Sequence, residues 1–343
     1  MTQAVARPAR LAGITAATLM LLLAALVFGA AVGETRIPFG TVLQTVANRL
    51  WNAGYPLDPI DAGIVWNYRL SRAVVAAACG AALAVSGVVL QSLLRNALAD
   101  PYLLGISAGA SSGAVAVAIL GFGGGVLTLP VGALAGALIA FGLVSGLAVL
   151  AGRGPAAIIL AGIAGSQLFN ALTSFVVTKS ATADEARGIM FWLLGNLSGI
   201  RWPDAALAVP VALAGLFVCL VHARTLDGFA FGAGAAASLG IPVRRVRVVL
   251  IGTTALMTAV MVSITGSIGF VGLVIPHAAR LVVGVRHGAL LPASALIGAV
   301  FMIAAVVLSR TVIPGQVLPI GVMTALVGAP AFALILIHRP VTR

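Results

Sequence analysis

The sequence predicts an all-α, polytopic membrane protein whose single transmembrane domain covers residues 1–343 and contains about ten transmembrane helices. Hydrophobic residues make up 61% of the chain and charged residues 8%, and the mean hydropathy is +1.15. A soluble domain carries about a quarter charged residues. In addition, no charged residue occurs between Asp100 and Arg153. That stretch has room for two helices of about 20 apolar residues, each able to cross a bilayer.

Charged residues, prolines and glycine clusters divide the apolar sequence into ten spans, of which the eighth is short or broken. They fall at 11–32, 63–94, 103–121, 128–151, 156–178, 203–222, 246–265, 268–285, 290–312 and 317–337. The first span could be a secretory signal peptide, because Arg7 and Arg10 precede it. It lacks an evident small-residue cleavage site and more spans follow, so an uncleaved helix is favoured. Glycines spaced four apart predict close helix packing: Gly105, Gly109 and Gly113, Gly132 and Gly136, Gly142 and Gly146.

The distribution of positive charge predicts the orientation of the chain in the membrane. With the N-terminus in the cytoplasm, most lysines and arginines fall in cytoplasmic segments, so both termini are expected there. The net charge of +12 does not indicate nucleic-acid binding, because the arginines are scattered between apolar runs and form no basic face. The basic residues are instead expected to meet membrane lipid headgroups.

Three connections between the spans are long enough to have structure of their own. The outer-surface segment 33–60 contains a helical pattern at 37–51, and 180–202 carries a second outer helix. On the cytoplasmic side, segment 223–245 predicts two short helices, Leu226–Phe231 and Ala233–Leu239. This segment is either an ordinary basic loop or the place where a cytoplasmic partner binds.

The chain lacks the motifs of several functional classes. It has no HExxH, no GxSxG and no GxxxxGK[ST], and its four histidines are far apart in sequence. Cys79 and Cys219 lie within apolar runs and predict buried free thiols, with no metal site. The spans are nearly devoid of ionisable residues, unlike those of a proton-coupled carrier. We therefore expect no enzyme activity in this chain, and any ATPase that drives transport must be a separate subunit.

Two groups of polar residues at the span ends stand out. Arg69, Arg72 and Arg310 lie at the outer ends of their spans, where the charge rule disfavours them. They either snorkel to the interface or receive carboxylates of a soluble partner, and the residues alone leave both open. The stretch "RNALADPYLLG", residues 95–105, predicts a tight loop in which Asp100 and Pro101 start the next helix.

Three sequence blocks in order resemble the FecCD, or type II, permeases of bacterial ABC importers for ferric siderophores, haem and vitamin B12. The blocks are "RLSRAVVAAACGAALAVSGVVLQSLLRNALADPYLLGISAGA" at 69–110, "GSIGFVGLVIPHAARLVVG" with "RHGALLPASALIGA" at 266–299, and "LPIGVMTALVGAPAFALIL" at 318–336. The resemblance covers most of the chain.

The resemblance implies the location, the partners and the mechanism. The membrane would be a bacterial cytoplasmic (inner) membrane. The resemblance also implies a homodimer with the path along its two-fold axis, two cytoplasmic ATPase subunits and a docked periplasmic substrate-binding protein. ATP and Mg²⁺ would be held by the ATPase, and this chain would hold no cofactor. The expected function is import of an iron chelate, a ferric siderophore or haem, from periplasm to cytoplasm by alternating access. The alternatives are a cobamide (vitamin B12) importer and, from another class, an ion-coupled carrier that works alone.

The resemblance also assigns residues to the gate and to the docking surfaces. The RNPLADP-like loop places the cytoplasmic gate at Asn96 and Leu98, and its second element at Pro155 and Ala156, where the family has a polar pair. The docking arginines are Arg69 and Arg72 of RLSR, and Arg310. The ATPase-coupling pattern falls on "GAGAAASLG" and lacks the family's acidic residue. The coupling positions are therefore Gly232, Ala235, Leu239 and Gly240.

Overall fold

The computed structural model describes residues 3–33, 35, 37–152, 154–180 and 182–338. Within these residues every regular element is a helix. The helices are α1 (Gln3–Ala31), α2 (Phe39–Trp51), α3 (Pro59–Ile64), the π-helix η1 (Val65–Leu70), α4 (Ser71–Leu93), the 3₁₀ turn η2 (Pro101–Leu104), α5 (Ile106–Ala118), α6 (Leu129–Leu150), α7 (Pro155–Ser180), α8 (Ala183–Leu193), α9 (Trp202–Val221), α10 (Ala223–Phe229), α11 (Ala233–Ser238), α12 (Val243–Thr265), α13 (Val271–Val283), α14 (His287–Thr311) and α15 (Ile320–His338).

The predicted spans correspond to apolar helices of this structure. In the described part of the chain, six helices are long and apolar enough to cross a membrane, and four shorter apolar helices accompany them. The all-α class and the roughly ten spans are therefore confirmed. The eighth span is short as predicted, because α13 has 13 residues. The helices predicted at 37–51 and within 180–202 and 223–245 are also present, as α2, α8 and the pair α10 and α11.

Two span boundaries differ from the prediction. The third span was expected to be helical from residue 103, but Gly105 adopts a left-handed conformation that separates η2 from α5, which has only 13 residues. The second span begins earlier than expected, at Pro59. The Asp58 carboxylate accepts hydrogen bonds from the N–H groups of Ile60 and Asp61 and so caps a continuous 35-residue helical run that ends at Leu93.

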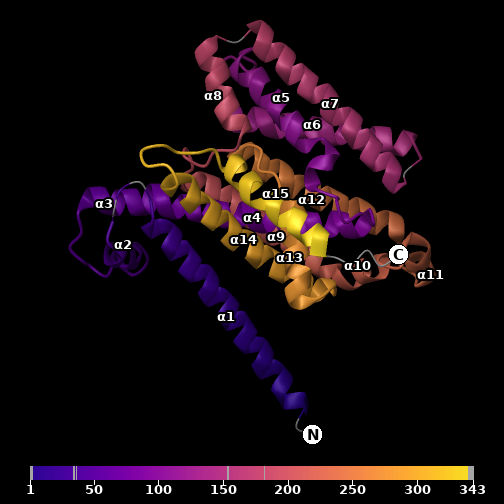
Figure 1. Cartoon of the computed structure of the whole chain (residues 1–343), viewed down its shortest axis with the longest axis horizontal. Helices are drawn as coiled ribbons and strands as arrows, with labels where there is room; N and C mark the ends of the chain where they lie inside the picture. The colour runs from indigo at the N-terminus through magenta and orange to yellow at the C-terminus, as the bar shows by residue number, and fades with distance from the viewer. Residues whose placement is uncertain (1–2, 34, 36, 153, 181, 339–343) are drawn as a thin grey trace.

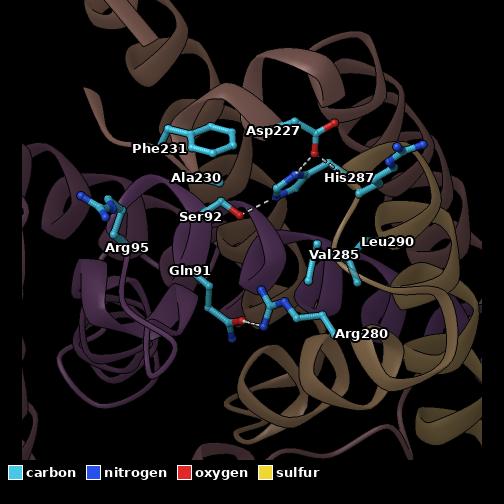
Figure 2. A pocket seen from close by; sticks show the side chains of 11 residues that line it. Gln91, Ser92, Arg95, Asp227, Ala230, Phe231, Arg280, Val285, His287 and Leu290 are labelled. Atoms are coloured by element: carbon cyan, nitrogen blue, oxygen red, sulfur yellow. Dashed lines mark hydrogen bonds and ion pairs between the residues drawn. The ribbon is translucent and has the colours of Figure 1, made fainter. Parts of the chain in front are cut away.

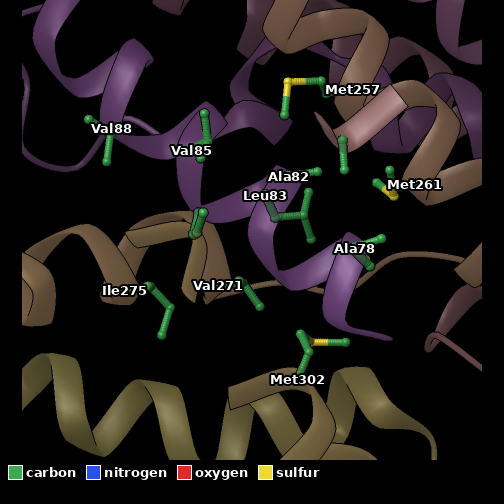
Figure 3. Close-up of a cluster of buried hydrophobic side chains, with 14 of the residues drawn as sticks. Ala78, Ala82, Leu83, Val85, Val88, Met257, Met261, Val271, Ile275 and Met302 are labelled. Atoms are coloured by element: carbon green, nitrogen blue, oxygen red, sulfur yellow. The ribbon is translucent and has the colours of Figure 1, made fainter. Parts of the chain in front are cut away.

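Helix α4 lies at the centre of the molecule, and its apolar side chains form the main core (Figure 1). Gly87 contacts the backbone of Gly272 in α13, and Gly80 contacts that of Gly298 in α14, so closely that a Cβ at either position would overlap a carbonyl oxygen. Figure 3 shows the side chains of α4 among those of α12, α13 and α14: Ala78, Ala82, Leu83, Val85, Val88, Met257, Met261, Val271, Ile275 and Met302.

Helices α5, α6, α7 and α8 form a second group along one side of the helices around α4 (Figure 1). Gly109 and Gly113 of α5 meet Gly132 and Gly136 of α6 backbone to backbone, which confirms that these glycines serve packing. Gly142 and Gly146 have open space around them instead. The spacing of four residues therefore predicts a packing contact only where a second helix is present.

Candidate functional site

The loop between α4 and α5 is held in shape by its own polar side chains. Asn96 Oδ1 accepts a hydrogen bond from the backbone N–H of Leu98 at 2.9 Å, and Asp100 Oδ1 accepts one from the N–H of Tyr102 at 2.9 Å. Asp100 and Pro101 begin η2, as predicted. The Leu98 side chain is 54% exposed, although it is apolar. The loop is thus a preformed turn that presents one exposed leucine.

The same loop is anchored to the segment between α12 and α13, residues 266–270. The Tyr102 hydroxyl donates to the carbonyl of Ile268 at 2.9 Å and accepts from the N–H of the same residue at 2.9 Å. Ser107 Oγ donates to Ser267 Oγ at 2.9 Å. The two bonds of Tyr102 satisfy the backbone N–H and C=O of Ile268, which lies between α12 and α13 and has no helical partner for these groups. A shift of the loop would therefore move the end of α12 and the start of α13.

A cavity of about 340 Å³ lies where the loop meets α7, and its lining residues are Asp100, Tyr102, Leu103, Gly162, Ile163, Ser166 and Gln167. Below it, Gly162 lies against the carbonyl of Leu103, where a Cβ would overlap the oxygen. Burial raises the pKa of the Asp100 carboxyl to about 6, and the hydrogen bond from the Tyr102 N–H only partly opposes this effect. Pro155 and Ala156 begin α7 and are exposed. The gate assignments remain predictions, but the first gate loop does lie against α7.

Helix α7 carries a polar stripe that the sequence reading missed. We call Gln167, Asn170, Ser174 and Thr178 the α7 stripe; all four side chains are exposed. Their spacing of three and four residues places them on one face of the helix. An amide that faces lipid has no hydrogen-bond partner, so this face is unsuited to the hydrocarbon region. The spacing is visible in the sequence and could have revealed the stripe.

The segment 223–245 folds as the helices α10 and α11 and has both buried and exposed apolar side chains. Leu226 and Phe229 of α10 are fully buried. Phe231 and Leu239, in contrast, are 78% and 70% exposed. Both lie outside the spans, so lipid tails do not account for their exposure. Of these two, only Leu239 was expected to contact a partner.

The four predicted coupling positions differ in their exposure. Gly240 is exposed and Ala235 is half-buried. Gly232 is buried and has φ +101°, a conformation that other residues rarely adopt. A Cβ at Gly232 would lie 3.2 Å from Nη1 of Arg95. The loop after α4 therefore touches the coupling segment directly.

A second cavity, of about 490 Å³, lies where the end of α4 meets α10, α13 and α14. Figure 2 shows its lining residues: Gln91, Ser92, Arg95, Asp227, Ala230, Phe231, Arg280, Val285, Arg286, His287 and Leu290. His287 Nδ1 is 2.6 Å from Asp227 Oδ1, and His287 Nε2 is 2.6 Å from Ser92 Oγ. Arg280 donates to Gln91 Oε1 at 2.7 Å. These contacts join residues that are 60 to 195 positions apart in sequence.

The charges around Asp227 keep its carboxyl ionised. Burial alone would raise its pKa, but hydrogen bonds from the backbone N–H and the ring of His287, with the charge of Arg286, hold it below the ordinary value. The contact of Asp227 Oδ1 with the His287 N–H, at 2.9 Å, also caps the first turn of α14.

The predicted docking arginines lie in different surroundings. Arg69, in η1, is buried and donates to the carbonyls of Ala30 and Ala31 at 3.4 and 2.8 Å, and to Thr35. It thereby caps the end of α1. Arg72 is also buried, and Arg310 is partly exposed and donates to Ser198 Oγ at 2.8 Å. Binding of a partner by these three residues stays a prediction.

Cys79 and Cys219 are buried free thiols, as the sequence predicts. Among the described residues, no group of three or more histidine, cysteine, aspartate and glutamate side chains is arranged to hold a metal ion.

Comparisons with known proteins extend these observations. The FecCD transport family model matches residues 21–338. The chain is 39% identical over 324 residues to the uncharacterised ABC transporter permease YvrB of Bacillus subtilis, which is 92% of this chain and 90% of that protein. It is 44% identical over 281 residues to the cobalamin import permease BtuC of Halobacterium salinarum, or 81% of this chain and 74% of that protein. A solved structure assigned to the metal-chelate type of ABC transporter, in an inward-facing conformation, has a TM-score of 0.82 and 28% identity; the match covers 95% of this chain and 99% of the other.

Proposed function

The chain belongs to the FecCD transport family of ABC permeases, and we propose that it is the membrane subunit of an ATP-driven importer for a metal chelate. In this proposal the substrate moves from the periplasm to the cytoplasm by alternating access, and the chain itself catalyses no reaction. The membrane is the cytoplasmic membrane, with both termini inside, in accord with the bias of positive charge.

The α7 stripe is the observation that carries this proposal. It is an exposed polar face on a helix that is otherwise apolar enough to cross a membrane. The stripe begins at Gln167, which also lines the cavity beside the gate loop. A polar face that ends at the gate loop is suited to line a water-filled path. It holds no charged group that would retain a substrate.

One copy of the chain leaves the α7 stripe uncovered, so we propose a homodimer in which two stripes face each other across the path. The two-fold axis then runs along the path, and each copy contributes one loop with Asn96 and Leu98 to the inner gate. Pro155 and Ala156, at the exposed start of α7, would form its second element.

Two further surfaces have features that suit the soluble partners of the importer. Phe231 and Leu239 are exposed apolar side chains that would enter grooves of a cytoplasmic ATPase, which binds ATP and Mg²⁺. On the outer side, Arg72 and Arg310, with Arg69, would receive carboxylates of a substrate-binding protein. Two ATPase subunits and one binding protein complete the proposed complex.

The substrate class is a metal chelate, and its identity is open between cobamides and iron chelates. The similarity to a permease named for cobalamin import makes vitamin B12 the first compound to test. Ferric siderophores and haem are the next, in keeping with the wider family.

Reconstitution tests the proposal. The permease, its ATPase and its binding protein are placed in liposomes, and uptake of radiolabelled cobalamin, a ferric siderophore and haem is measured with ATP on the ATPase side. We expect uptake of one of these compounds only when all components and ATP are present. Uptake by the permease alone, driven by a proton or sodium gradient, would identify an ion-coupled carrier and contradict the proposal.

A further inference from the structure

Three side chains from distant parts of the chain form a continuous hydrogen-bonded line beside the 490 Å³ cavity, and we call them the clasp: Ser92, His287 and Asp227. Figure 2 shows the His287 ring between the other two side chains. Its Nε2 lies 2.6 Å from Ser92 Oγ and its Nδ1 lies 2.6 Å from Asp227 Oδ1. The His287 side chain is 7% exposed and that of Asp227 is 43% exposed, so the ring is shielded from water and the carboxylate is only partly shielded.

The protons of the clasp can be assigned by counting donors and acceptors. Asp227 is ionised and accepts only, so His287 Nδ1 carries a proton toward it. The Ser92 hydroxyl has one proton and two neighbouring acceptors, the Val88 carbonyl at 2.9 Å and His287 Nε2 at 2.6 Å. If the ring is neutral, Ser92 donates to Nε2. If the ring is protonated, Nε2 donates to Ser92, which then donates to Val88. The clasp is closed in both states.

The clasp connects the coupling segment to the helix that leads into the gate. Asp227 lies in α10, whose Leu226 and Phe229 are buried against the core, so this helix and its neighbours α4 and α14 are packed together. Ser92 lies in the last turn of α4, just before Arg95 and Asn96. His287 is the first residue of α14, and its backbone N–H is also bound by Asp227.

We propose that Ser92, His287 and Asp227 are positioning residues that transmit movement of the coupling segment to the gate loop. The clasp makes α10, the end of α4 and the start of α14 move as one unit. The proximity of Arg95, in the gate loop, to Gly232, in the coupling segment, supports the same unit. This inference rests on the proposed function, because the clasp would connect the ATPase contact of the permease to its gate.

The same three residue types form the triad of serine hydrolases, but the surroundings here do not suit catalysis. A hydrolase holds its oxyanion with N–H groups that are free to point at the substrate. Ser92 lies inside α4, where backbone N–H groups are used by the helix, and its hydroxyl lies within bonding distance of Val88 in the preceding turn. The clasp therefore has the serine–histidine–aspartate arrangement of a hydrolase triad but lacks the oxyanion site that catalysis needs.

The test separates the two bonds of the histidine. His287→Asn keeps an amide near the position of Nδ1, which can bind Asp227, and loses the bond to Ser92. His287→Gln reaches toward Ser92 and loses the bond to Asp227. Ser92→Ala breaks the same bond as His287→Asn with little change in volume. Ser263→Ala is the matched control, because this buried serine in α12 also bonds to a carbonyl of its own helix.

Each variant is assembled with the ATPase and binding protein, and both ATP hydrolysis and substrate uptake are measured. We expect hydrolysis within about twofold of the unmodified complex, and uptake per ATP reduced about tenfold in Ser92→Ala, His287→Asn and His287→Gln, a loss within the range of allosteric coupling. Ser263→Ala keeps the normal ratio. The double variant Ser92→Ala/His287→Asn falls no further than either single variant, because both remove one bond.

Unchanged uptake per ATP in both Ser92→Ala and His287→Asn would overturn the inference and leave the clasp as local packing. If His287→Asn fails to assemble, Ser92→Ala tests the same bond with the smaller change. Labelling of Ser92 by a fluorophosphonate probe would also overturn it, since it would identify a nucleophile. A complex without the substitutions that shows no ATP-dependent uptake would instead refute the proposed function.

Discussion

At the scale of single residues, Gly162 determines how closely α7 approaches the gate loop. A side chain at this position would overlap the Leu103 carbonyl, so α7 or the loop must shift to accommodate it. We expect Gly162→Ala to destabilise the protein by about 1–3 kcal/mol, as overpacking does. Thermal unfolding in detergent measures this loss. Gly142→Ala and Gly146→Ala, which place a methyl group in open space within α6, serve as controls; they should not destabilise the protein and should stabilise it by up to about 1 kcal/mol, because alanine is the better helix former.

Asp100 provides a second prediction at this scale, through its raised pKa. The folded protein holds a proton on this carboxyl up to a pH of about 6, whereas the ordinary value is 3.8. The folded state therefore binds more protons between these two values, and its stability falls as the pH rises through this window. Asp100→Asn cannot ionise and keeps an acceptor for the Tyr102 N–H.

We therefore expect Asp100→Asn to raise the melting temperature more at pH 7.5, where the native carboxyl is ionised, than at pH 5. Melting curves of both proteins at the two pH values measure the difference. An equal effect of the substitution at both values would show that burial does not raise the pKa of Asp100.

At the scale of elements, the coupling segment divides into a buried and an exposed part. Leu226 and Phe229 hold α10 in the core, whereas Phe231 and Leu239 are exposed. We expect Phe231→Ser and Leu239→Ser each to weaken ATPase binding by about 2 kcal/mol, or roughly 30-fold, as loss of an apolar anchor does. Melting temperatures should stay unchanged, since neither side chain is packed. Binding in detergent, measured by co-purification or titration, tests this expectation.

Ile60→Ser is the control for the two coupling variants, because Ile60 is 72% exposed on α3, far from the coupling segment in sequence and in space (Figure 1). It should leave ATPase binding intact. Normal binding by both coupling variants would place the ATPase contact elsewhere on the permease.

At the scale of the whole molecule, the α7 stripe predicts where the aqueous path lies. Polar thiol reagents react with the thiolate form of cysteine, and this form is available only where water reaches the side chain. We expect Ser174→Cys to react with a membrane-impermeant thiol reagent in the assembled complex. Leu172→Cys, also exposed on α7 but about 200° around the helix, should face lipid and stay unreactive. Similar labelling at the two positions would argue against a path along this face, and the buried Cys79 and Cys219 give little background.

The sequence by itself determined the membrane class, the all-α fold, the approximate positions of the ten apolar helices and the two short helices of the coupling segment. Hydropathy and the positions of glycine and proline affect the structure of the turn or span in which they occur, so this structure can be predicted from a short stretch of sequence. Tertiary structure alone decided that Arg69 caps α1, that a Cβ at Gly142 would meet no atom of the described residues within 4 Å, and that Ser92, Asp227 and His287 meet. Such contacts join residues far apart in the chain, and they depend on how the helices pack around α4, which no local pattern encodes.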